Sequence, residues 1–130
     1  MRWAGLILLM LVQPVFGFEY VLIYDHECRS GGPAKTLPFN CKKSTGKAVL
    51  RQRADGKWVG VNGNKEVLLS VIKNDEYILV LNDPVPYSGM STIYLMKPTG
   101  RFYWSEFAYS EILKADEGHV RFGRLELKKR

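Results

Sequence analysis

The chain has 130 residues, two cysteines and a formal net charge of +6. A chain of this length can bury a sufficient hydrophobic core, so it does not need the dense disulfides of a miniprotein. It contains no internal repeat and no low-complexity tract, which argues against a repeat array and a compositionally biased linker.

The first 17 residues have the pattern of a secretory signal peptide. Arg2 supplies the positive start, residues 4–12 are apolar, and the expected cut follows Gly17. The apolar run is too short to cross a membrane without including Pro14. We therefore expect export to the periplasm or the secreted space. A single domain over residues 18–130 would remain, and the loss of Arg2 would lower its net charge to +5.

Segments rich in β-branched and aromatic residues recur along the rest of the chain, separated by turn residues every 8 to 12 positions. This spacing predicts an all-β fold, a small antiparallel barrel or sandwich of about eight strands. The first six extended segments are expected at 18–24, 37–42, 48–53, 58–61, 67–72 and 77–81. The last two are apolar on both faces and should be covered. A short helix over 64–73, capped by Asn64, is the alternative that the β-branched residues disfavour.

The dipeptide Asp55-Gly56 predicts a type I′ turn between two of these strands. In that register Arg51 and Arg53 share a face with Trp58, and Arg53 lies opposite the indole. This arrangement would allow a cation–π contact.

Positive charge is concentrated in the same region. Between residues 42 and 65 there are seven basic residues and one acid. The alternatives are a solvated outer face and a patch for an anionic partner. As candidate partner-binding residues we take Arg51, Arg53, Lys57 and Trp58.

The stretch "STIYLMKPTGRFYWSEFAY" predicts a hairpin with a three-residue loop, Pro98 to Gly100. The expected cross-strand pairs are Lys97 with Arg101, Met96 with Phe102, and Tyr94 with Trp104. The second strand carries rings on both faces, Phe102 and Trp104 on one and Tyr103, Phe107 and Tyr109 on the other. The rings on one face should pack in the hydrophobic core. Those on the other face are covered by a second layer, line an internal cavity or form an exposed interaction surface. Trp104, and Tyr87 from the preceding loop, complete the candidate partner-binding set.

The end of the chain is expected to form one more strand. Residues 110–119 are interpreted as a loop or a single helical turn. The segment 120–127 alternates, with Val120 and Phe122 on one face and Arg121 on the other.

Asp25-His26-Glu27-Cys28 combines residue types found in metal and catalytic sites. In an oxidising compartment, however, Cys28 and Cys41 are expected to form a disulfide, which stabilises by on the order of 3 kcal/mol. An oxidised cysteine is neither a nucleophile nor a metal ligand. The one other histidine, His119, would reach His26 if the first and last strands paired. Because zinc requires three or four ligands, we predict no metal site.

Nothing in the sequence indicates catalysis. It has no G-x-S-x-G elbow and no glycine-rich phosphate loop before a helix. We expect no catalytic residue and no cofactor, and hydrolase activity is the least favoured hypothesis.

The preferred hypothesis is an exported, non-enzymatic binding domain for an unknown protein or an anionic envelope component. Peripheral membrane contact is compatible with its charge, whereas export argues against nucleic acid. The alternative is a calycin-like carrier that holds a small apolar ligand near Tyr94 and Trp104.

Overall fold

The computed structural model describes residues 18–31, 36–83 and 88–129. These residues form a single sheet of nine strands, and all of its pairings are antiparallel. The strands are β1 (Phe18–Gly31), β2 (Thr36–Lys43), β3 (Lys47–Gln52), β4 (Trp58–Asn62), β5 (Lys65–Asn74), β6 (Ile78–Asp83), β7 (Ser88–Met96), β8 (Arg101–Ser110) and β9 (Ala115–Lys129). The all-β prediction is confirmed. The proposed signal peptide and Tyr87 lie outside the described residues.

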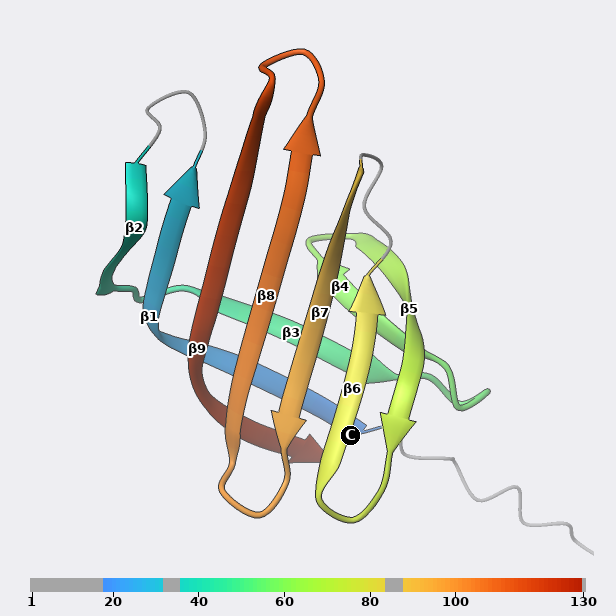
Figure 1. Cartoon of the computed structure of the whole chain (residues 1–130). Coiled ribbons are helices and arrows are strands. Elements are labelled where there is room, and N and C mark those ends of the chain that lie inside the picture. Colours follow the sequence, from blue (N-terminus) through green and yellow to red (C-terminus); the bar gives the residue numbers. More distant parts are fainter. Residues whose placement is uncertain (1–17, 32–35, 84–87, 130) are drawn as a thin grey trace, which may run out of the picture.

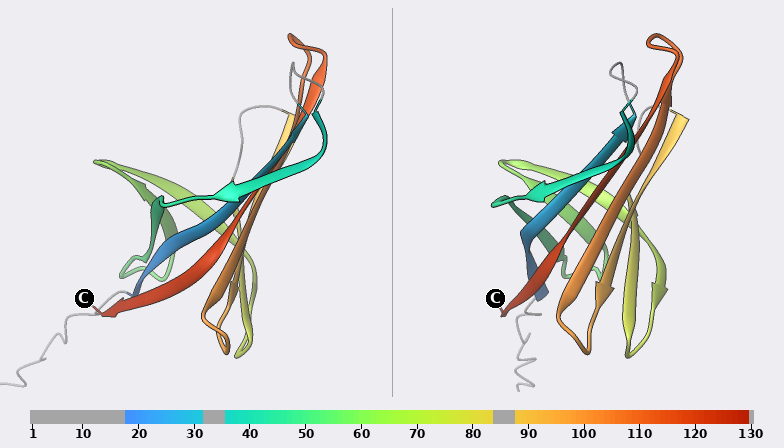
Figure 2. Two further views of the ribbon diagram at one scale, coloured as in Figure 1. Left: turned by 90° about the vertical axis from the view of Figure 1, so that its left-hand side faces the viewer. Right: turned by 60° about the vertical axis from the view of Figure 1, so that its left-hand side comes forward.

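The sheet closes into an eight-stranded barrel because β1 pairs with β9. The order of hydrogen-bonded neighbours is β2-β1-β3-β4-β5-β6-β7-β8-β9, so β2 is an additional strand beside the barrel. The N-terminal half of β1 and β3 cross behind β7, β8 and β9, which extend above them (Figure 1). Figure 2 shows the long strands β8 and β9 edge-on as one wall. No helix in the described part of the chain is long and apolar enough to span a membrane.

β1 holds the barrel together by changing partners along its length. Its first half pairs with β3, its second half pairs with β2, and β9 follows both halves. The ladder with β9 shifts by one residue between Tyr24 and His26, a β-bulge that bends the strand. Gly123 lies at this bulge, where an added Cβ would overlap the carbonyl oxygen of Ile23. The close approach of the two backbones therefore requires glycine there.

The β8–β9 connection is much shorter than the sequence indicated. β8 continues to Ser110 and β9 begins at Ala115, so only residues 111–114 form a turn. The prediction of a loop or helical turn over 110–119 is wrong, since most of this segment is strand. Tertiary pairing of Asp116 and Glu117 with β8 outweighs their low intrinsic strand preference.

The predicted disulfide is confirmed. Cys28 lies directly opposite Cys41 in the β1–β2 ladder, with a Cα–Cα distance of 4.0 Å. The bond is compatible with an oxidising compartment. It ties the additional strand β2 to the second half of β1.

The barrel interior is filled by one face of the alternating strands. Its buried members are Leu22, Leu50, Trp58, Leu69, Leu79, Leu81, Ile93, Leu95 and Phe102. The segments 67–72 and 77–81 were both expected to be covered on both faces. The second, in β6, is largely buried, whereas the first, in β5, is not. In β5 only Leu69 is buried, and Ile72 is 61 % exposed, because no further layer covers the outer side of that strand. β5 is a strand, so the helical alternative is excluded.

The β3–β4 turn differs from the predicted type I′ geometry. Gly56 has a φ of 84°, whereas Asp55 does not have positive φ. The Gly56 N–H donates to the Arg53 carbonyl at 2.9 Å, and the Asp55 carboxylate accepts the Lys57 N–H at 3.0 Å. This is a type I turn followed by a left-handed glycine. It pairs Gln52 with Trp58, so the predicted opposition of Arg53 and Trp58 is wrong.

The β7–β8 hairpin is shifted by one residue from the predicted register. Its loop has four residues, closed by the Gly100 N–H on the Met96 carbonyl at 2.9 Å. The Lys97 N–H donates to the Tyr77 carbonyl at 2.9 Å, which continues the β6–β7 ladder one residue beyond the pair of Ile78 and Met96. The observed pairs are Met96 with Arg101, Leu95 with Phe102, Tyr94 with Tyr103, and Ile93 with Trp104. The three predicted pairs are therefore wrong.

Candidate functional site

The predicted basic patch does not form around a tryptophan. Trp58 is 5 % exposed and stacks on Tyr20 inside the barrel, with ring centroids 5.7 Å apart. Arg51 pairs with Val59 on the opposite face of the sheet. Its guanidinium contacts the carboxylates of Glu19 at 3.3 Å and Glu66 at 3.4 Å. Arg51 is thus neutralised by its own neighbours, and the predicted shared face with Trp58 is wrong.

The other predicted partner-binding residues are dispersed. Arg53 is exposed and contacts Asp55 of its own turn at 3.4 Å, and Lys57 is exposed beside it. Trp104 lies within the barrel, and its indole N–H donates to the buried Ser91 hydroxyl at 2.7 Å. We name Arg53 and Lys57 the turn patch, and its role in binding stays a prediction.

A continuous row of rings crosses the outer face of four strands. Tyr94 pairs with Tyr103, Tyr103 with Phe122, and Phe122 with His26. His26 and Phe122 lie 5.4 Å apart with nearly parallel planes, and Phe122 and Tyr103 lie 6.4 Å apart. Tyr103 is 39 % exposed. The row begins on β7 and ends on β1, so closure of the barrel assembles it.

Two arginines form the next row on this outer face. Arg101 lies directly opposite Arg124, two residues before Tyr103 and two residues after Phe122 on the respective strands. Both arginines are exposed, and within the described residues neither has an ion-pair partner. Like charges directly opposite each other destabilise a sheet. The fold therefore keeps a charge arrangement that costs stability.

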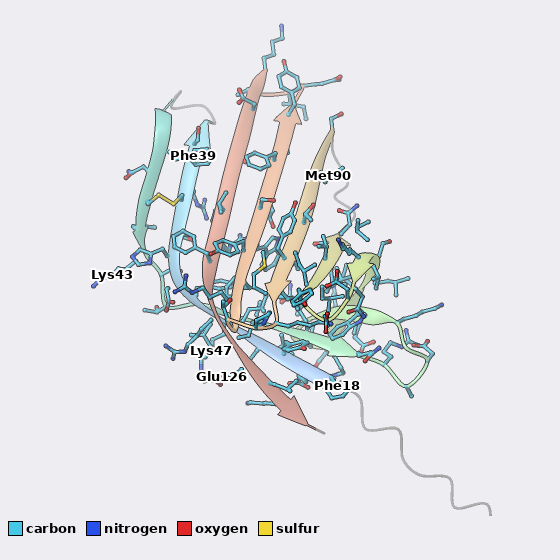
Figure 3. The ribbon with its side chains drawn as sticks, turned by 60° about the horizontal axis from the view of Figure 1, so that its bottom comes forward. Phe18, Phe39, Lys43, Lys47, Met90 and Glu126 are labelled. Atoms are coloured by element: carbon cyan, nitrogen blue, oxygen red, sulfur yellow. A yellow bond between two sulfur atoms is a disulfide. The ribbon has the colours of Figure 1, made fainter. Side chains whose placement is uncertain are left out.

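Three members of the ring row, His26, Tyr103 and Phe122, and the arginine pair line one groove of about 860 Å³. We name it the basic–aromatic groove. Its lining includes two rings of the barrel core, Tyr24 and Phe102, together with His26, Lys43, Ser44, Thr45, Thr99, Arg101, Tyr103, Phe122 and Arg124. Lys43 is the last residue of β2 and lies below Phe39, a residue from the middle of that strand, in Figure 3. Asp25 is the one acid that lines the groove. The groove thus combines three cations, the aliphatic hydroxyls of Ser44, Thr45 and Thr99, and a wall of rings, and it lies within the size range of small-ligand sites.

A second polar cluster lies inside the barrel. The guanidinium of Arg121 lies 4.7 Å from the ring centroid of Trp104 and 5.9 Å from that of Tyr24. It also donates to Glu106 at 3.2 Å. The predicted cation–π contact of Arg53 with Trp58 is not found, and Trp104 instead has a cation–π contact with Arg121, which lies directly opposite it in the β8–β9 ladder.

The same cluster contains His119, whose Nε2 lies 3.3 Å from the Glu27 carboxylate. Lys42 contacts the other Glu27 oxygen at 3.3 Å. Burial lowers the pKa of His119, assisted by the positive charges of Arg121 and Arg29. The hydrogen bond from Lys42 is the main cause of a lowered pKa for Glu27. These groups satisfy one another, which is what a partly buried ionic cluster requires to be stable. We name Glu27, Glu106, His119 and Arg121 the interior ion cluster.

The two histidines do not share a site. β1 and β9 pair as the hypothesis of a joint metal site required, but His26 lies on the outer face and His119 faces the interior. Among the described residues no group of three or more His, Cys, Asp or Glu side chains is placed to hold a metal ion.

The basic–aromatic groove was missed by the sequence interpretation, although one signal was present. "RFY" at 101–103 and "FGR" at 122–124 each place an arginine two positions from a ring. Residues two apart on a strand share a face. The pairing of β8 with β9 brings both pairs together, whereas the interpretation followed local charge density.

Comparison with known proteins adds no family to this picture: no protein-family model, no curated protein and no solved structure matches the chain.

Proposed function

We propose that the protein is a non-enzymatic binding domain that engages an anionic partner through the basic–aromatic groove. The observation that carries the proposal is the cross-strand pair of Arg101 and Arg124, neither of which has an ion-pair partner among the described residues. A phosphate, sulfate or carboxylate placed between the two guanidinium groups would accept charge-assisted hydrogen bonds from both. Such a partner would also relieve their mutual repulsion.

The neighbouring rings support a partner with an apolar or planar part beside its charge. Tyr103, Phe122 and His26 form the wall next to the arginines. Amphipathic anions such as phospholipid headgroup regions and acidic glycans have this combination of features. An exported protein would meet them in the envelope or the secreted space, in agreement with the expected localisation.

The structure gives less support to the carrier hypothesis. Tyr94 pairs with Tyr103 on the outer face, whereas Trp104 pairs with Ile93 on the inner face. The two rings therefore cannot line one cavity. The space beside Trp104 is occupied by the charged side chain of Arg121, which is a poor neighbour for an apolar ligand.

The proposal is tested with two variants of equal charge. Arg101→Gln/Arg124→Gln removes two positive charges from the groove, and Arg53→Gln/Lys57→Gln removes two from the turn patch. Sedimentation with phosphatidylglycerol vesicles measures binding at low and at high salt. We expect the groove variant to lose at least about tenfold in affinity at low salt, since each arginine to a charged oxygen contributes roughly 1–3 kcal/mol.

The turn variant controls for the general effect of net charge. It should lose much less affinity than the groove variant, because Arg53 already contacts Asp55. Equal losses would mean that vesicles sense only the overall charge, and the proposed groove would then be rejected. A larger loss in the turn variant would restore the original basic patch as the binding surface.

A further inference from the structure

A second groove lies at the other end of the same outer face, and its chemistry is the opposite of the first. Its volume is about 480 Å³ and its ring-bearing residues are Phe39 on β2 with Phe107 and Tyr109 on β8. Their exposed fractions are 45 %, 50 % and 46 %, so half of each side chain faces solvent. Phe107 lies six positions after Arg101 on β8, a distance of about 20 Å along the strand. The two grooves are therefore separate sites.

Gly118 forms the floor of this groove. A Cβ built on Gly118 would lie 3.1 Å from an edge carbon of Phe107 and 3.1 Å from the tip of Phe39. The two rings thus flank the glycine from both sides. Among the described aromatic residues, no ring contact joins Phe39 to Phe107. The two rings close over the glycine and fill the place that a side chain at position 118 would need, and their half-exposed faces line the groove.

The charge at this end is negative. Asp116 lies opposite Tyr109 in the β8–β9 ladder and on the same face as Gly118, and Glu117 lies beside it. The segment 110–117 contains three acids and one lysine. In the part of the chain that the structure describes, neither Asp116 nor Glu117 forms an ion pair. The Asp116 carboxylate is thus available to a positively charged ligand in the groove, whereas Glu117, the next residue along the strand, alternates to the other face.

From this geometry we infer that the groove is a binding site for a small organic cation that carries a quaternary ammonium group. We name it the acidic–aromatic groove, formed by Phe39, Phe107, Tyr109, Asp116 and Gly118. Ring faces attract cations through their quadrupole, and several rings around one space are the arrangement used for quaternary ammonium ions. The carboxylate of Asp116 adds the opposite charge.

The chemistry of the walls favours a quaternary over a primary ammonium group. A primary ammonium group has three N–H donors that need acceptors when it leaves water. The groove walls are mainly ring carbon, and its hydroxyl-bearing residues besides Tyr109 are Ser30, which pairs with Gly118, and Ser88, which pairs with Tyr109. A quaternary ammonium group has no N–H donor, so it loses no hydrogen bond when the rings surround it.

The experiment compares choline with its neutral isostere, 3,3-dimethylbutan-1-ol, by NMR titration of the full mature protein. The two probes have the same shape, so only a site that recognises charge distinguishes them. We expect saturable shifts of Gly118 and its neighbours with choline, at millimolar affinity, and at least about tenfold weaker binding of the neutral alcohol. Nα-acetyl-lysine amide is the third probe and should bind more weakly than choline.

Phe107→Leu removes one ring wall but keeps an apolar side chain. We expect it to weaken choline binding by about two- to fivefold. Tyr103→Leu is the matched control, because it removes an exposed ring from the same face of the same strand outside the groove. It should leave choline affinity unchanged.

The inference is overturned if choline and the neutral alcohol bind equally, since the groove would then be merely apolar. It is also overturned if no saturable shift occurs, or if Tyr103→Leu and Phe107→Leu have the same effect. Stronger binding of the lysine derivative would contradict the quaternary ligand and assign the groove to a lysine side chain.

Discussion

Arg124→Gln should stabilise the protein while it weakens anion binding. The substitution removes one of two like charges that lie directly opposite in the β8–β9 ladder. Two unit charges ~5 Å apart in water repel each other by about 0.8 kcal/mol, and exposure and side-chain mobility lower the realised value. We therefore expect the free energy of unfolding to rise by about 0.5 kcal/mol at low salt.

Urea denaturation measures this effect without adding ions. With an m-value of about 1.5 kcal/mol/M the transition midpoint should rise by roughly 0.3 M. The gain should disappear in 1 M NaCl, where the screening length is about 3 Å. Lys65→Gln is the control, because Lys65 is exposed and lies opposite the neutral Asn62.

A double-mutant cycle separates mutual repulsion from the effects of each arginine. Arg101→Gln alone should stabilise to a similar degree, and the second substitution should then add nothing, since one charge has no like partner left. Additive gains, or a gain that persists at high salt, would refute the repulsion argument. Such a result would also remove the main support for an anion between the two arginines.

Three further predictions concern stability. Cys28→Ser/Cys41→Ser should lower the free energy of unfolding by about 3 kcal/mol, because the disulfide joins residues 13 positions apart. The urea midpoints of the oxidised wild type and the variant measure this loss, and an unchanged midpoint would contradict the prediction. Gly123→Ala should destabilise by more than about 2 kcal/mol, since its Cβ would overlap the Ile23 carbonyl oxygen. Gly100 has a φ of 65° and open space around it, so Gly100→Ala should cost only about 1 kcal/mol. Thermal melts that rank the two variants in reverse would reject the bulge argument. Burial lowers the pKa of His119 in the folded protein, so the unfolded chain binds more protons just below pH 6.5. The stability that depends on His119 should therefore be complete above that pH and fall as the pH drops toward the folded pKa. Thermal melts between pH 7.5 and 5 should show a smaller loss for His119→Gln than for the wild type or His26→Gln, and an equal loss in all three would exclude His119 as the cause.

The strands and the disulfide were predictable because their signals are local. Alternation in "RFYWSEFAY" correctly separated Phe102 and Trp104 from Tyr103 and Phe107, although it did not say which set faces the core. Cys28 and Cys41 were correctly paired because the chain has no other cysteine.

The site was not predictable because the predicted registers of the β3–β4 and β7–β8 hairpins were each wrong by one residue, which assigned side chains to the wrong neighbours and faces. In the β3–β4 turn the Asp55 carboxylate accepts the Lys57 N–H, and the β7–β8 loop has four residues where three were predicted, closed by the Gly100 N–H on the Met96 carbonyl. A shift of one residue exchanges the two faces of a strand. Trp58 was thereby expected on the surface, and the neighbours of Arg101 were assigned incorrectly.

The pairing of the first strand with the last has a consequence for how the chain folds. Phe18 pairs with Lys129, so the barrel cannot close until almost the whole chain is available. Contacts between such distant residues form slowly, because the entropy of loop closure must be lost before they stabilise anything. The β1–β2 hairpin is local, by contrast, and its disulfide joins residues only 13 positions apart. We therefore expect oxidation to precede barrel closure, so that a preformed hairpin presents the strand edge onto which β9 finally docks.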